Sequence, residues 1–150
     1  MEKSIISGDV NRSLKTCLNG EITIFSFEHT FGSGELLDTV NQPITEIATF
    51  YFLPGITDEQ IKEFDIAFKA MEKAVLAQPG NFGATAGHTV GLLRNPDIGV
   101  DVKAFIANAQ WASLEAHVAF SQTPEFGEAL GPLIPFLSGN AVSHVAFKKA

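Results

Sequence analysis

The strongest constraint on the fold is the order in which strand-like and helix-like segments follow one another from residue 44 onward. Residues 44–53 are rich in β-branched and aromatic side chains and end at a Pro-Gly pair, which is typical of a strand followed by a turn. A helix is predicted to begin after Thr57, because Thr is a good N-cap and two acidic residues follow it. Apolar residues recur at intervals of three and four from Ile61 to Val75, so this helix has one buried face.

The rest of the chain continues this alternation. The further predicted elements are two strands, a helix that bends near its middle, and a last strand: residues 81–93, 103–111, 114–137 and 141–147. A turn is predicted at residues 94–97, Ser113 is a good N-cap for the second helix, and Pro124 marks the bend. The resulting βαββαβ order predicts an α+β, ferredoxin-like domain, in which two helices cover one face of a four-stranded antiparallel sheet.

Residues 1–43 fit this unit poorly and are predicted to form an N-terminal extension of a domain that spans residues 44–150. Residues 21–31 alternate in polarity, which predicts one extra strand. The sequence is compatible with three positions for the extension: it lines an edge of the sheet, it covers the pocket, or it crosses to a partner subunit. Two helices leave one sheet face bare, and a second copy of the chain is the most economical cover for it. We therefore predict a homodimer.

The composition limits the classes of partner. The 150 residues suit one domain, and a net charge of −7 disfavours binding to nucleic acid or to an anionic membrane surface. No apolar stretch reaches the roughly 18 residues that a membrane span requires. The single cysteine, Cys17, forms no intrachain disulfide, and the start of the chain lacks the apolar core of a secretory signal. We expect a cytoplasmic protein without membrane segments.

One part of the sequence carries a family resemblance. Its most specific residues run from the third strand of the predicted unit into the second helix: Trp111-x-Ser113-x-Glu115-Ala116-His117-x-x-Phe120. With Pro132 and Gly139 downstream and Thr45-Glu46-Ile47-Ala48 on the first strand, this pattern resembles the antibiotic biosynthesis monooxygenase group of dimeric α/β-barrel proteins, especially its small fungal members. The resemblance implies a dimer with back-to-back sheets and a pocket in each subunit between the sheet and its two helices.

Two departures from the family pattern concern the reaction. Quinol-forming members of the group carry an Asn four residues before the Trp, whereas this chain has Ala107 there and Asn108 on the opposite strand face. Haem-degrading members use a His well down the second helix, and residues 127–131 contain none. These departures weaken the oxygenase interpretation and disfavour haem degradation.

The candidate catalytic residues are His88, His144 and Glu46. A neutral imidazole titrates near working pH, so each His is a potential acid or base, with a structural His as the alternative in both cases. Glu46 is flanked by apolar residues, and it is either a base with a raised pKa or a paired structural carboxylate.

The candidate substrate-binding residues are mostly aromatic: Trp111, Phe105, Tyr51, His117 and Phe120. The resemblance places the Trp at the pocket and makes His117 a structural residue, whereas core packing is the alternative for Trp111. Strand alternation puts the side chains of Tyr51 and Glu46 on opposite faces of the sheet, so both line one pocket only if a bulge intervenes. Strand alternation directs Phe105, Ala107, Ala109 and Trp111 toward the helices, and the two alanines leave a void for a flat ligand.

The sequence contains no phosphate-binding loop, zinc-protease motif or serine-nucleophile elbow, so no cofactor and no metal are predicted. The leading hypothesis is a cofactor-independent enzyme of secondary metabolism, which performs cyclisation, elimination or isomerisation by acid/base chemistry on a small apolar, polyketide-like or polycyclic substrate. The alternatives are a cofactor-free monooxygenase and a non-enzymatic stress-response or small-ligand-binding barrel protein.

Overall fold

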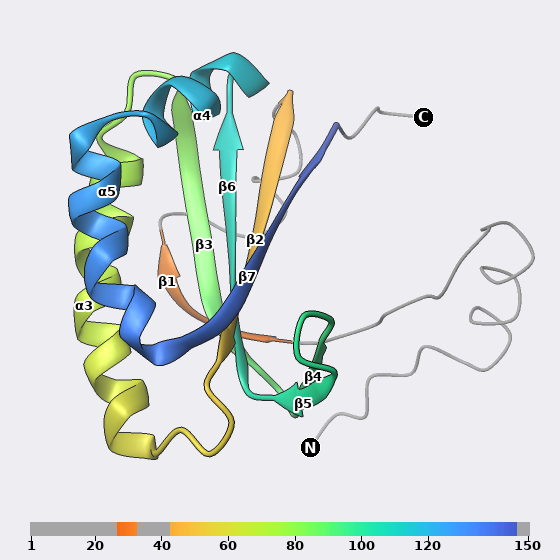
Figure 1. Cartoon of the computed structure of the whole chain (residues 1–150). Helices are drawn as coiled ribbons and strands as arrows, with labels where there is room; N and C mark the ends of the chain where they lie inside the picture. The colour runs from red at the N-terminus through yellow and green to blue at the C-terminus, as the bar shows by residue number, and fades with distance from the viewer. Residues whose placement is uncertain (1–26, 33–42, 147–150) are drawn as a thin grey trace, which may run out of the picture.

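The computed structural model describes residues 27–32 and 43–146 of the chain, which form an antiparallel five-stranded sheet with helices along one side (Figure 1). In spatial order the strands are β1 (Phe27–Gly32), β3 (Asn81–Thr89), β6 (Ala104–Trp111), β2 (Ile44–Phe52) and β7 (Leu137–Val145). The helices are α3 (Asp58–Leu76), α4 (Leu114–Ser121) and α5 (Pro124–Leu130), followed by the 3₁₀ helix η1 (Gly131–Phe136). A separate hairpin consists of β4 (Leu93–Asn95) and β5 (Val100–Val102). The α+β, ferredoxin-like prediction is confirmed.

The N-terminal strand β1 pairs antiparallel with β3 at one edge of the sheet. It covers the C-terminal half of the predicted extra strand, and residues 21–26 of that prediction lie outside the described residues. The sheet edge is thus the position that this part of the extension occupies.

The first helix begins where its sequence predicts. The side-chain oxygen of Thr57 accepts a hydrogen bond from the backbone nitrogen of Gln60 at 3.2 Å, and the Gln60 side chain accepts one from the Thr57 nitrogen at 3.0 Å. This capping box satisfies two N–H groups that an α-helix leaves unpaired at its start. A fixed helix start also fixes which side chains face the sheet, and Phe64, Phe68 and Met71 are the buried ones.

The second helix is shorter than predicted. It bends at Thr123 and Pro124 as expected, but α5 ends at Leu130 and gives way to η1, and β7 begins at Leu137 instead of residue 141. Pro132 and Pro135 explain the difference, because proline cannot donate the backbone hydrogen bond that would continue an α-helix. The turn predicted at residues 94–97 is also part of a larger element, the β4–β5 hairpin.

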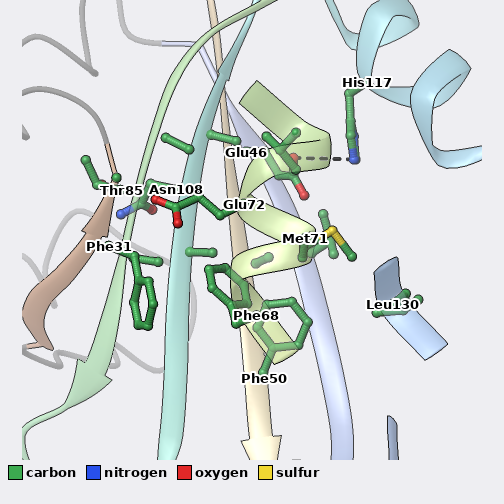
Figure 2. Close-up of a pocket in the computed structure, with 18 of the residues that line it drawn as sticks. Phe31, Glu46, Phe50, Phe68, Met71, Glu72, Thr85, Asn108, His117 and Leu130 are labelled. Atoms are coloured by element: carbon green, nitrogen blue, oxygen red, sulfur yellow. Dashed lines mark ion pairs between the residues drawn. The ribbon is translucent and has the colours of Figure 1, made fainter. Parts of the chain in front are cut away.

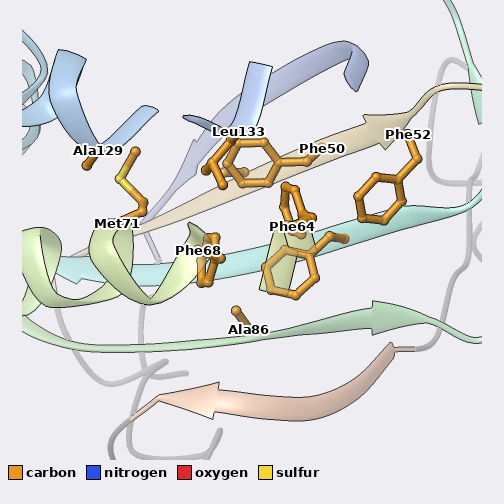
Figure 3. Packing of buried hydrophobic residues seen from close by; sticks show 10 residues of the cluster. Phe50, Phe52, Phe64, Phe68, Met71, Ala86, Ala129 and Leu133 are labelled. Carbon is orange, nitrogen blue, oxygen red and sulfur yellow. The ribbon is translucent and has the colours of Figure 1, made fainter. Parts of the chain in front are cut away.

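The main core lies between the helices and the sheet and consists largely of phenylalanine (Figure 3). Phe64, Phe68 and Phe105 meet edge to face, with ring centroids 5.2 Å apart for Phe64–Phe105 and 4.6 Å apart for Phe68–Phe105. A second cluster lies on the other sheet face, where Leu93 and Val102 of the hairpin cover Tyr51 and Ile106. Part of the face that was predicted to be bare is therefore covered by the chain itself.

Candidate active site

A cavity of about 230 Å³ lies between the sheet and the helices. Its floor is built from alanines that the strand register places side by side: Ala107 of β6 is paired with Ala48 of β2 and with Ala86 of β3. One row further along the sheet, Ala109 is paired with Ala84 and with Glu46. A methyl group fills little of the layer between sheet and helix, so these small side chains leave the space that forms the cavity.

The walls of the cavity are apolar and come from all three α-helices (Figure 2). They are formed by Phe68, Met71 and Val75 of α3, Phe120 of α4, Phe126 and Leu130 of α5, Phe31 of β1, Phe50 of β2 and Val142 of β7. Polar side chains are few, and the titratable ones among them are Glu46, Glu72 and His117.

Glu46 and His117 belong to a cluster of polar side chains at one end of the cavity, in which two hydrogen-bonded pairs meet. The indole Nε1 of Trp111 donates to Oε2 of Glu46 at 2.8 Å, and Nε2 of His117 lies 3.3 Å from the same oxygen. The other ring nitrogen of His117, Nδ1, lies 2.7 Å from Nε2 of His144. Figure 2 shows the Glu46 carboxylate directed toward His117.

Three local features bring these residues together. Glu46 and His144 are paired across β2 and β7, so both point to the helix side of the sheet. Ser113 caps α4 by accepting a hydrogen bond from the Ala116 nitrogen at 3.2 Å, and this cap places His117 in the first turn of the helix. The His117 ring lies against the Trp111 indole, with ring centroids 5.3 Å apart.

Burial shifts the titration of both cavity-lining members of the cluster. It raises the pKa of Glu46, an effect that the Trp111 hydrogen bond and the charge of His144 oppose. Burial also lowers the pKa of His117. A carboxyl with a raised pKa is a stronger base when ionised, and a perturbed pKa inside a cavity is typical of a functional site.

The structure separates the predicted site residues into two groups. Glu46, His117 and Phe120 border the cavity, and Trp111 and His144 lie one hydrogen bond away from it. The remaining predicted residues lie elsewhere: Phe105 is in the main core, Tyr51 is on the other sheet face, and His88 is near the other end of β6 from Trp111.

His88 has partners of its own. Its Nε2 lies 2.7 Å from Oδ1 of Asp65, and its ring stacks on Phe52 with centroids 5.8 Å apart. The structure therefore does not bring His88 together with Glu46 and His144.

Sequence analysis named His117 as a substrate-binding candidate but missed its contacts with the Trp111 ring and with His144. Its position six residues after Trp111, just inside a capped helix, was the signal for contact between the two rings. Asn108 and its β3 partner Thr85 border the cavity, but each lies between floor alanines of its strand, so strand alternation directs both side chains away from the helices, as predicted for Asn108. Oγ1 of Thr85 is buried and, within the described part of the chain, has no hydrogen-bond partner.

Neither a metal cluster nor a membrane helix is found in residues 27–32 and 43–146. No three His, Cys, Asp or Glu side chains in these ranges are grouped so that they could hold a metal ion. None of the helices there is long and apolar enough to cross a membrane.

Comparison with known proteins identifies structural relatives and no sequence relatives. No protein family model matches the sequence, and no curated protein matches it. A dimeric ferredoxin-like protein of unknown function from Thermobifida fusca is 19% identical, with a TM-score of 0.52 over 69% of this chain and 90% of that one. SnoaB, a cofactor-independent oxygenase from Streptomyces nogalater, is 20% identical, with a TM-score of 0.50 over 71% and 94%.

A third similar structure is a Bordetella bronchiseptica protein assigned as an antibiotic biosynthesis monooxygenase, with 18% identity and a TM-score of 0.52 over 71% of this chain and 97% of that one. The fold is that of these ferredoxin-like proteins. The structural neighbours thus include the group that the sequence resembles, and the fungal type stays a prediction. At these identities the similarity concerns the fold and leaves the reaction to be argued from the site.

Proposed function

We propose that this protein is an enzyme that removes a proton from carbon in a small apolar substrate, with Glu46 as the base. One observation carries the proposal: a carboxyl group with a raised pKa borders an otherwise apolar cavity, accepts a hydrogen bond from Trp111 and lies 3.3 Å from Nε2 of His117. Acid/base catalysis needs a base that is both oriented and close to its operating pH, and the surroundings of Glu46 favour both.

The cavity suggests the size of the substrate. A cavity of roughly 150 Å³ lined by apolar side chains holds one benzene molecule. The cavity here has about 230 Å³ and aromatic walls, which suits two fused rings. We therefore propose a bicyclic, polyketide-like carbon acid as the substrate class.

The cluster leaves one oxygen of Glu46 for chemistry. Trp111 and His117 both engage Oε2, and within the described part of the chain Oε1 receives no hydrogen bond. In the proposed step Oε1 takes a proton from the carbon next to a substrate carbonyl, and the electron pair of the C–H bond moves into that carbonyl to give an enolate. Return of the proton to another carbon is an isomerisation, attack of the enolate on a second carbonyl is a cyclisation, and loss of a leaving group is an elimination.

A cofactor-free monooxygenase is the second candidate, because the same carbanion can react with dioxygen. SnoaB, a cofactor-independent oxygenase, has a similar fold, which supports this alternative. Stoichiometric oxygen uptake with an anthrone or quinol, without added flavin or metal, would favour it over the proposed reaction. A ligand-binding protein without activity is the third candidate, and it predicts binding without turnover.

We also propose that the chain forms a homodimer. The Thermobifida fusca protein of similar fold is dimeric, and on this chain the outer edge of β7 is unpaired within the described residues. Light scattering at micromolar concentration is expected to give twice the chain mass of 16.1 kDa. A mass equal to one chain contradicts the dimer.

The base is tested with 5-nitrobenzisoxazole, a bicyclic apolar probe. A base that removes its ring C–H proton forms a nitrile and breaks the N–O bond to release a coloured phenolate, so one proton transfer is read directly. We expect the protein to accelerate this elimination above the buffer rate and Glu46→Gln to remove the acceleration. Glu63→Gln, at an exposed carboxylate of α3, is the matched control and is expected to retain it. Equal rates for the wild-type protein and Glu46→Gln would overturn the proposal.

A further inference from the structure

His117 uses both of its ring nitrogens. Nε2 faces Oε2 of Glu46 at 3.3 Å, and Nδ1 faces Nε2 of His144 at 2.7 Å. His117 is buried, whereas His144 is exposed on β7. The three side chains thus form a continuous line of polar contacts from the cavity to the protein surface.

The chemistry of the three groups fixes where the protons lie when Glu46 is ionised. A carboxylate cannot donate a hydrogen bond and repels a nitrogen lone pair, so Nε2 of His117, 3.3 Å from Oε2 of Glu46, is favoured as the protonated ring nitrogen. A neutral imidazole has one donor and one acceptor nitrogen, so Nδ1 of His117 accepts. The donor for that bond is then Nε2 of His144, whether the His144 ring is neutral or charged.

We propose that His144 is a positioning residue, which donates to Nδ1 of His117 and thereby holds the His117 proton on Nε2, against the carboxylate of Glu46. This inference rests on the proposed role of Glu46 as a base. Without the donor at position 144, the proton of His117 can move to Nδ1, and the lone pair of Nε2 then faces Glu46. That arrangement favours the protonated carboxyl, which is inactive as a base.

The surroundings of the cluster leave few other groups to set its protonation. Within the described part of the chain, the titratable side chains that face Glu46 are His117 from α4 and His144 from β7, while β6 contributes the neutral donor Trp111. Glu72 of α3 also borders the cavity. The charge of His144 lowers the pKa of Glu46, which acts in the same direction as the tautomer that His144 enforces.

The experiment compares two substitutions that differ in hydrogen-bonding capacity. His144→Leu removes the donor, and His144→Lys supplies a side chain that can only donate. Ser143→Leu, at the neighbouring exposed position of β7, is the control for a leucine on this strand. Long-range ¹H–¹⁵N correlation spectra at pH 8 report the tautomer of His117, and the pH dependence of 5-nitrobenzisoxazole elimination reports the ionisation of Glu46.

We expect the His117 proton on Nε2 in the wild-type protein, in His144→Lys and in Ser143→Leu, and a mixture of tautomers in His144→Leu. The acid limb of the rate profile is expected to move to higher pH in His144→Leu, with a rate on that limb about 2- to 10-fold lower, the effect of one lost hydrogen bond. A wild-type His117 proton on Nδ1, or a His144→Leu variant with unchanged tautomer and acid limb, would overturn the inference. So would an equal loss of rate at all pH values that His144→Lys fails to restore.

The two readouts separate this inference from the proposed function. If the wild-type protein does not accelerate the probe, Glu46 is not the proposed base, and the spectra still decide whether His144 controls the tautomer of His117. If the probe reacts and Glu46→Gln is inactive while the His117 spectra of His144→Leu match those of the wild-type protein, the function stands and the role of His144 is refuted.

Discussion

Filling the alanine floor of the cavity separates ligand binding from folding. Ala107 lies in the middle of the floor, between Ala48 and Ala86, and a phenyl group on its Cβ points into the space above. Since a benzene ring occupies a cavity of roughly 150 Å³, this ring would use about two thirds of the available 230 Å³. The remainder is too small for a second ring, so Ala107→Phe is expected to exclude a bicyclic ligand.

The effect on stability is small because two contributions oppose each other. Burying the phenyl group contributes about 1.5–3 kcal/mol, and any overpacking against the helices costs about 1–3 kcal/mol. The free energy of unfolding is therefore expected to stay within about 2 kcal/mol of the wild-type value. Displacing one ligand ring, in contrast, removes a similar 1.5–3 kcal/mol from binding, which corresponds to an affinity loss of about 10- to 150-fold.

The assay combines thermal or urea unfolding with the specificity constant for 5-nitrobenzisoxazole. Ala119→Phe, on the exposed side of α4, is the matched control and is expected to retain wild-type binding. Unchanged probe turnover in Ala107→Phe would refute the location of the ligand. Dissociation of the dimer with binding intact would show that the assigned sheet face is the wrong one.

Two further substitutions test the cluster. Trp111→Phe removes the N–H group 2.8 Å from Oε2 of Glu46, so the acid limb of the pH–rate profile for probe elimination should move to higher pH. The free energy of unfolding should fall by about 1.5–3 kcal/mol, the range for a hydrogen bond to a charged group. An acid limb that does not move would show that the indole does not support the base. Burial lowers the folded-state pKa of His117, so as the pH drops below 6.5 the unfolded chain takes up a proton before the folded chain does, and the free energy of unfolding of the wild-type protein should fall. Urea unfolding of His117→Gln should lack this part of the decline. If the free energies of unfolding of the two proteins change with pH in parallel, the shift is contradicted.

The sequence was sufficient to predict those features that depend on local chemistry. Thr57 and Ser113 begin their helices as N-caps, and the alternation in β6 directs Ala107 and Ala109 toward the cavity. These features follow from hydrogen bonding within a few residues and from the two-residue period of a strand. The location of the cavity could therefore be anticipated from the small residues of one strand.

The composition of the site depended on strand register, which local patterns do not encode. His144 reaches His117 only because β7 pairs with β2 so that His144 lies opposite Glu46. The last strand was predicted to begin at residue 141, but Ser138 already binds the backbone oxygen of Phe52 at 2.8 Å and fixes β7 from its start. The pairing of distant strands decided which of the histidines meet, and it left His88 with Asp65 instead.

The titration of the Glu46 carboxyl is the most direct test of the central claim. ¹³C NMR can follow the side-chain carboxyl resonances of the protein with pH, and Glu46→Gln assigns the signal by its absence. We predict a midpoint above the ordinary value of 4.5, because burial in the apolar cavity outweighs the Trp111 hydrogen bond and the charge of His144. A midpoint at or below 4.5 would show a carboxylate that is merely paired with its neighbours, and it would contradict the role of Glu46 as the base.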